Sequence, residues 1–269
     1  MRLVFIVAGA ATVLAFVAVS IYRRVRHGAR LARYRELLDR VYEDRVVTDE
    51  EKEKRGRLKT ELGLSDHEAR EESLRLYKSV VQEAGADREL TAGERDELAR
   101  LQSSLRISDT EIATEKAELD YLKFLSEVRE GELPALDIPI ALVPGETGHW
   151  YDGGEWTSAK DASAAIRAAA ASGVRWNPKD PAPPDFSAAR STALPGGFAG
   201  SRKGKLVLTN QRLFLLGRKI DAEANLADVY YVELFRDGLI LDGRDGPFAA
   251  IRTERPEAIA LLLQRIYRA

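Results

Sequence analysis

The pattern of apolar and polar positions begins with an apolar run, Leu3 to Tyr22, that holds no charged residue and no proline. A helix needs about 20 apolar residues to cross the roughly 30 Å hydrocarbon core of a bilayer. The run therefore predicts one membrane-spanning helix, with residues 1–30 forming this anchor and a basic juxtamembrane segment.

Several arginines follow this apolar run closely, whereas only Arg2 precedes it. Basic residues near a span tend to stay in the cytoplasm, so the later domains are predicted to be cytoplasmic at the cell inner membrane. A cleaved secretory signal is the alternative, because Ala18 and Ser20 would suit a cleavage site. The long apolar run and the position of the arginines favour the anchor. These arginines are Arg23, Arg24, Arg26, Arg30 and Arg33.

Residues 31–130 show apolar positions every three or four residues, the spacing of one helix face, beginning at Leu31, Tyr34 and Leu38. The stretch from Asp44 to Glu68 matches the stretch from Asp87 to Glu111 at an offset of 43 residues. Two similar helical hairpins are therefore predicted. Their charges alternate in sign, which is typical of a solvated helix face.

Helix starts in both copies are marked by a hydroxyl residue followed three positions later by Glu. This is the capping box, in which the hydroxyl accepts from the third helical N–H and the Glu accepts from the cap N–H. The predicted caps are Thr48, Ser65, Thr91 and Ser108.

The segment ADRELTAGERDELARLQSSLRIS, Ala86 to Ser108, resembles the TerB-like helical domains associated with tellurite resistance. Units of that family read as an acidic turn, a Thr or Ser cap, a Glu, and a leucine-rich helix that ends near Gly-Leu-Ser. The first copy supplies Gly63, Leu64 and Ser65, whereas the second has Arg106 in place of the glycine. The resemblance implies an all-α repeat domain over about 31–130.

After a proline-bearing linker at 131–139, the composition changes to β-branched and aromatic runs separated by glycine turns. Two runs around Thr-Asn-Gln-Arg at 209–212 predict a hairpin, with Asn210 in the turn. A second hairpin is predicted across Arg236, Asp237 and Gly238. A further strand, Gly246 to Arg252, and a helix from Pro256 complete the domain.

This order resembles the pleckstrin-homology-like superfold, and within it the GRAM-like and bacterial PH-like domains. The resemblance is carried by LVPGE at 142–146, GKLVLTNQRLFLLG at 204–217 and VELFRDGLIL at 232–241. It implies, for 140–269, a partly open antiparallel barrel capped by a C-terminal helix, which binds lipid headgroups or protein segments and does no chemistry. An alanine-rich helix and a proline-rich loop at about 157–203 depart from that pattern as an insertion. The predicted fold class is thus α+β and multidomain, with an N-terminal transmembrane helix.

Basic residues gather around the first predicted hairpin, where they could hold anionic lipid headgroups. The alternative is that they are edge-strand cations that discourage aggregation. The predicted ligand-binding residues are Arg202, Lys203, Lys205, Arg212, Arg218 and Lys219.

Composition narrows the classes of function. The net charge of −2 offers no excess of positive charge for nucleic acid. Cysteine is absent, the three histidines are far apart, and a calcium loop starting at Asp87 would have Ala92 sixth and Leu98 twelfth, where Gly and Glu are needed. No metal, cofactor or catalytic residue is predicted.

The sequence therefore predicts a single-pass, membrane-anchored, non-enzymatic adaptor or scaffold that binds a protein partner or anionic lipid. An exported membrane-associated binding protein and an accessory subunit of a membrane enzyme complex are the alternatives.

Overall fold

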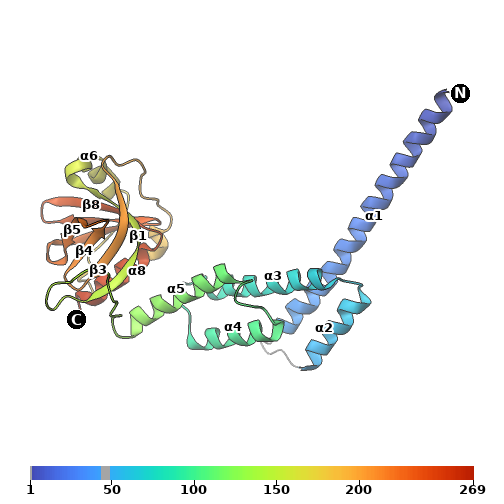
Figure 1. The fold of residues 1–269 in the computed structure, drawn as a ribbon, viewed down its shortest axis with the longest axis horizontal. Coiled ribbons are helices and arrows are strands. Elements are labelled where there is room, and N and C mark those ends of the chain that lie inside the picture. Colours follow the sequence, from blue (N-terminus) through green and yellow to red (C-terminus); the bar gives the residue numbers. More distant parts are fainter. Residues whose placement is uncertain (1, 44–48) are drawn as a thin grey trace. The chain divides into compact units, whose positions relative to one another are not determined.

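The structure is a computed structural model that describes residues 2–43 and 49–269, with side chains at 20–40 and 50–269. The chain divides into two compact units, the helical unit (Met1–Lys123) and the sheet unit (Phe124–Ala269). Figure 1 shows the helices and strands of each unit.

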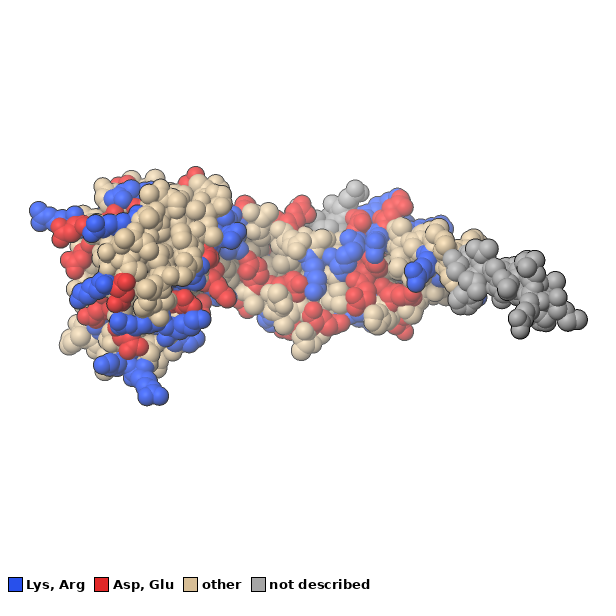
Figure 2. Space-filling view, turned by 90° about the horizontal axis from the view of Figure 1, so that it is seen from above, with Lys and Arg blue, Asp and Glu red and all other residues tan. Residues whose placement is uncertain are grey.

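The helical unit is built from five helices, the last of which continues into the sheet unit. They are α1 (Arg2–Glu43), α2 (Asp49–Glu61), α3 (Asp66–Ala84), α4 (Ala92–Leu105) and α5 (Ala113–Glu130). Figure 2 shows Lys and Arg side by side with Asp and Glu along this unit.

The predicted membrane-spanning helix requires a correction. Among the described residues, no helix is long and apolar enough to cross a bilayer. The side chains of residues 1–19 lie outside the described ones. The fold class and the membrane description that included this span are therefore wrong in that element.

Two of the predicted capping boxes are confirmed. Ser65 and Thr91 each accept from the N–H of the Glu three residues later, and that Glu accepts from the cap N–H. Thr48 lies outside the described residues. At Ser108, the Glu111 carboxylate accepts from the backbone N–H at 2.9 Å, but the Glu111 N–H donates to the Ser108 carbonyl, and α5 begins only at Ala113. A turn therefore precedes α5.

The helical repeat extends further than the matching sequence segments. Three side-chain contacts of the first copy recur 43 residues later in the second, and each keeps its acidic partner. The paired contacts are His27 with Glu68 and Arg70 with Glu111; Arg35 with Glu72 and Lys78 with Glu115; and Lys59 with Asp66 and Gln102 with Asp109. The duplicated unit is thus α1–α2–α3 followed by α3–α4–α5, with α3 used twice.

Two tyrosines occupy equivalent core positions in these overlapping units. Tyr34 on α1 is 2% exposed, and Tyr77 on α3 is 1% exposed. Burial raises the pKa of both hydroxyls. Leu38 and Val81, four residues further on, are buried as well. The core of the first copy is therefore rebuilt by the second.

The sheet unit contains one antiparallel sheet in the order β2-β6-β7-β8-β1-β3-β4-β5. The strands are β1 (Gly148–Ser158), β2 (Val174–Trp176), β3 (Arg202–Thr209), β4 (Arg212–Leu216), β5 (Ile220–Asn225), β6 (Tyr231–Phe235), β7 (Gly238–Gly243) and β8 (Gly246–Arg252). Its helices after α5 are α6 (Ala159–Ala170), α7 (Phe186–Ala189), the short 3-10 helix η1 (Leu226–Asp228) and α8 (Pro256–Ile266).

Both predicted hairpins are confirmed, as β3–β4 and β6–β7, and so are the strand at β8 and the helix that begins at Pro256. Strand β1 was not predicted, although it lies in the middle of the sheet between β8 and β3. Its two central glycines hide the strand pattern. A Cβ at Gly154 would meet the Leu206 side chain at 2.2 Å, so the close packing of β1 on β3 requires glycine there.

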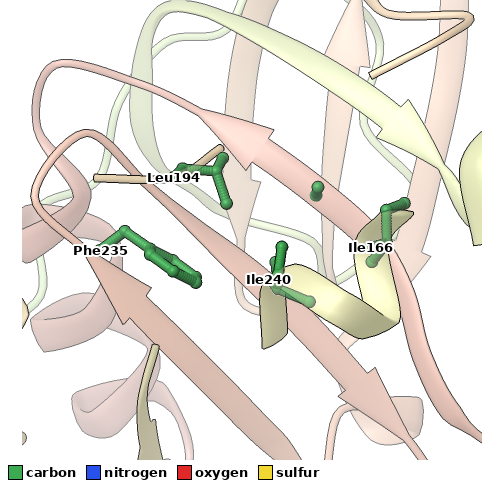
Figure 3. Packing of buried hydrophobic residues seen from close by; sticks show 6 residues of the cluster. Ile166, Leu194, Phe235 and Ile240 are labelled. Carbon is green, nitrogen blue, oxygen red and sulfur yellow. The ribbon is translucent and has the colours of Figure 1, made fainter. Parts of the chain in front are cut away.

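One face of the sheet is covered by α6 and by the segment around Leu194. Ile166 of α6 packs with Leu194, Phe235 and Ile240, and Figure 3 shows these four side chains gathered over β6 and β7. In a second hydrophobic cluster of the sheet unit, Ile138 packs on Val207 and Phe214. Helix α8 is buried along most of its length and contacts β6.

Two segments outside the predicted strands contribute to these contacts. Ile138, within the predicted linker 131–139, is part of the core of the sheet unit. The predicted insertion at 157–203 contains the expected alanine-rich helix, but it also supplies β2, which pairs with β6. Both segments therefore belong to the packed sheet unit. The barrel implied by the resemblance remains a prediction.

Candidate functional site

Four of the six predicted binding residues lie at one end of the β3–β4 hairpin. Lys203 and Lys205 alternate along the solvent-facing side of β3, and Lys205 stands opposite Leu216. Arg218 and Lys219 follow directly in the exposed turn before β5. We call Lys203, Lys205, Arg218 and Lys219 the basic edge.

Only weak surface interactions restrain the two lysines of the basic edge. Lys203 Nζ lies 2.9 Å from Glu155 on β1, yet its side chain is 84% exposed. That ammonium holds the pKa of Glu155 below its ordinary value. Lys205 Nζ lies 5.5 Å from the centre of the Tyr151 ring. Exposed pairs of this kind contribute little to stability, so both cations remain available to an anion.

Arg202 stands beside the basic edge but is partly occupied. It donates to the Asp221 carbonyl at 2.8 Å and lies 3.7 Å from the Asp161 carboxylate. Its side chain is about half exposed. It therefore adds to the local positive charge less than the four members of the basic edge.

Arg212 is not part of a binding surface. Its guanidinium donates to both oxygens of Glu146, at 2.8 and 3.0 Å, and the Glu146 side chain is fully buried. Thr209 Oγ1 donates to the same carboxylate at 2.8 Å. Burial alone would raise the pKa of Glu146, but the hydrogen bonds from Arg212 and Thr209 outweigh it and hold the pKa below its ordinary value. Arg212 is therefore a structural residue.

Asn210 completes this network. Its side-chain oxygen accepts from the Thr147 N–H at 2.9 Å, and its nitrogen donates to the Gly145 carbonyl at 3.0 Å. The Thr-Asn-Gln-Arg turn and the Val-Pro-Gly-Glu segment are thus joined by side chains 63 or more residues apart. Each of these two motifs therefore satisfies polar groups of the other.

A buried acidic pair was missed in the sequence. Glu233 on β6 and Asp242 on β7 are 1% and 4% exposed, and one nitrogen of Arg175 lies 2.6 and 2.8 Å from their carboxylates. Tyr231 stacks on the same guanidinium at 3.9 Å. Burial raises the pKa of Glu233, against the charge of Arg175. The sequence did contain a sign of this pair, because each of the apolar runs VELF (232–235) and LILD (239–242) holds a single acidic residue.

This arrangement favours a structural role for the acidic pair. One half-exposed guanidinium holds both acidic side chains, and breaking such a buried arrangement is costly. The three tryptophans Trp150, Trp156 and Trp176 are also buried. Within the described residues, no group of three or more His, Asp or Glu side chains could hold a metal ion. The chemistry that the sheet unit offers to a ligand is therefore the exposed charge of the basic edge.

Comparison with known proteins adds no relative: no protein-family model matches the chain, and no curated protein is significantly similar to it. The TerB-like and PH-like resemblances therefore remain predictions.

Proposed function

We propose that this protein is a non-enzymatic binding protein whose sheet unit binds anionic phospholipid headgroups through the basic edge. The observation that carries the proposal is the sorting of the cations: four face solvent together, while Arg212 is committed to a buried carboxylate. A cation near an anionic leaflet contributes about 1 kcal/mol. Together, less the competition from Glu155, they contribute roughly 3–4 kcal/mol, which corresponds to a dissociation constant near 1 mM.

Binding this weak acts as a peripheral contact that depends on the salt concentration. Exposed charges are screened over about 8 Å at physiological ionic strength, so the contact is lost as salt rises. The cytoplasmic location and the protein partner expected from the sequence stay predictions.

Co-sedimentation of the full chain with vesicles tests the proposal. The quantity to compare is the bound fraction on vesicles with about 30 mol % phosphatidylserine minus that on phosphatidylcholine alone. The variant Lys203→Glu, Lys205→Glu, Lys219→Glu is expected to lose at least about five-fold of this difference.

A matched control changes the net charge by the same amount elsewhere on the sheet unit, at the exposed residues Lys160, Arg236 and Arg244, each to Glu. The control is expected to lose less than about two-fold. Equal losses in the two variants would reduce the effect to net charge, and no dependence on phosphatidylserine in the parent chain would show that the basic edge does not bind lipid.

A further inference from the structure

The helical unit contains a groove of about 490 Å³ that is lined by α1, α2, α3 and the end of α4. Its charged lining is five cations and one acid: Lys52, Arg55, Lys59, Arg70, Arg106 and Asp66. We call this the basic groove. The mixed charge of the helical sequence hides it, because the cations converge only when α2, α3 and α4 pack.

Lys59 and Arg70 of this groove have acidic partners. Lys59 pairs with Asp66, and Arg70 forms a two-pronged pair with Glu111, which lowers the Glu111 pKa to about 2. Arg70 also donates to the Leu105 carbonyl at 3.0 Å, so it is held in place at the end of α4. These pairs fix the wall of the groove without filling it.

Arg55 and Arg106 also line the groove, but neither has an acidic partner among the residues whose side chains are described. The positive charges of Arg55 and Lys59 act on the buried Tyr34 hydroxyl, which also lines the groove. Ser103 adds an exposed side chain on the α4 side. The groove is thus surrounded by the guanidiniums of Arg55 and Arg106, the ammonium of Lys59 and the hydroxyls of Tyr34 and Ser103.

The backbone of Arg106 is a second, independent observation. It adopts a left-handed conformation, φ 55° and ψ 35°, at the end of α4. The equivalent residue of the first repeat is Gly63, with φ 61°, which adopts this conformation freely. Arginine adopts this left-handed conformation only at an energetic cost, and this arginine lines the groove. Strained residues of this kind gather at functional sites.

We propose that the basic groove binds a small anion that carries several phosphate groups. A volume of a few hundred Å³ is that of a small-molecule site. Arginine forks bind phosphate oxygens in pairs, and the excess of positive charge needs a ligand with more than one negative charge. This site lies within the helical unit and is independent of the lipid contact proposed for the sheet unit.

Titration calorimetry of the full chain with inorganic triphosphate, free of divalent metal, tests the assignment. Arg55→Gln and Arg106→Gly are each expected to weaken binding by at least about five-fold, and the double variant to abolish measurable heat. Arg106→Gly removes the cation while relieving the backbone, so a loss of binding in a variant that stays folded comes from the lost cation. Circular dichroism of each variant checks the fold.

The matched control is Arg100→Gln, an exposed arginine of α4 outside the groove, which is expected to stay within about two-fold of the parent. Absence of heat with triphosphate up to millimolar concentration would overturn the proposal. Unchanged affinity in both groove variants, or an equal loss in Arg100→Gln, would overturn it too.

Discussion

The two helical repeats use the same acids at equivalent positions but different bases to meet them. Glu68 and Glu111 are paired with His27 and Arg70, respectively, whereas Glu72 and Glu115 are paired with Arg35 and Lys78. The buried tyrosine of each repeat is kept as well. The difference teaches that the acid and the tyrosine specify the hairpin, while the basic partner can be exchanged.

Helix α3 ends the first repeat and begins the second, so Glu72 takes its equivalent place in the first copy and Tyr77 in the second. Substitutions on α1, α2 and α4 act on one copy only. Paired substitutions at equivalent positions therefore measure whether the two copies are energetically equal or only alike in geometry.

The largest effect is expected at the core tyrosines. Tyr34→Ala and Tyr77→Ala each remove a buried ring, which costs about 3–5 kcal/mol for a large aromatic side chain. If the copies are equal, the two losses agree within about 1 kcal/mol. Urea unfolding followed by helical circular dichroism measures both. A much smaller loss at Tyr34 would show that the first copy is not an equal part of the cooperative core.

The second effect compares equivalent acids, Glu72 and Glu115. Glu72 is buried and receives hydrogen bonds from Arg35 and Arg75, whereas Glu115 meets Lys78 at 3.1 Å. Glu72→Gln is expected to cost about 1–2 kcal/mol, because it leaves Arg35 without its anion and Arg75 with Asp39 alone. Glu115→Gln is expected to cost about 0.5 kcal/mol, because Lys78 is nearly half exposed. Equal costs in urea unfolding would contradict the comparison.

The pH dependence sharpens the same comparison. The hydrogen bond from Arg35 lowers the pKa of Glu72, although burial opposes it. A carboxyl whose pKa is lower in the folded chain stabilises the fold above its ordinary pKa and loses this contribution as the pH falls below it. The difference between the parent chain and Glu72→Gln is therefore expected to be full at pH 7 and to shrink below about pH 4.

Local signals in the sequence were enough for the elements whose ends are chemically marked. Ser65 and Thr91 show their caps within four residues, and the turns of both hairpins are read from adjacent positions. The repeat was visible only where it is most similar. Tyr34 and Tyr77 are also 43 residues apart, but a single matching pair of tyrosines is a weak signal of a repeat.

What the sequence could not show depends on contacts between distant segments. Arg212 resembles the exposed cations around it until Glu146, 66 residues away, is placed beside it. The cations of the basic groove likewise come together only through packing. The apolar run at Leu3–Tyr22 invited a membrane span from composition alone, and the described helices do not provide one.

The last comparison concerns a position where the repeats differ in backbone strain. Arg106→Gly removes a side chain from a left-handed position and is expected to stabilise the chain by about 1 kcal/mol. Gly63→Ala does the reverse, at a similar cost. An added Cβ at Gly63 would meet only a nitrogen of Arg30 at 3.6 Å, an ordinary contact, so that cost comes from the backbone alone. Thermal and urea unfolding measure both shifts.

A loss of stability in Arg106→Gly would contradict this account, because it would mean that the arginine side chain supports the fold more than its backbone strains it. Gain of stability together with loss of triphosphate binding is the expected combination. That result would distinguish the roles of the two helix ends. In the first repeat, Gly63 after α2 suits the left-handed turn, whereas in the second repeat Arg106 after α4 lowers the stability but places a cation in the groove.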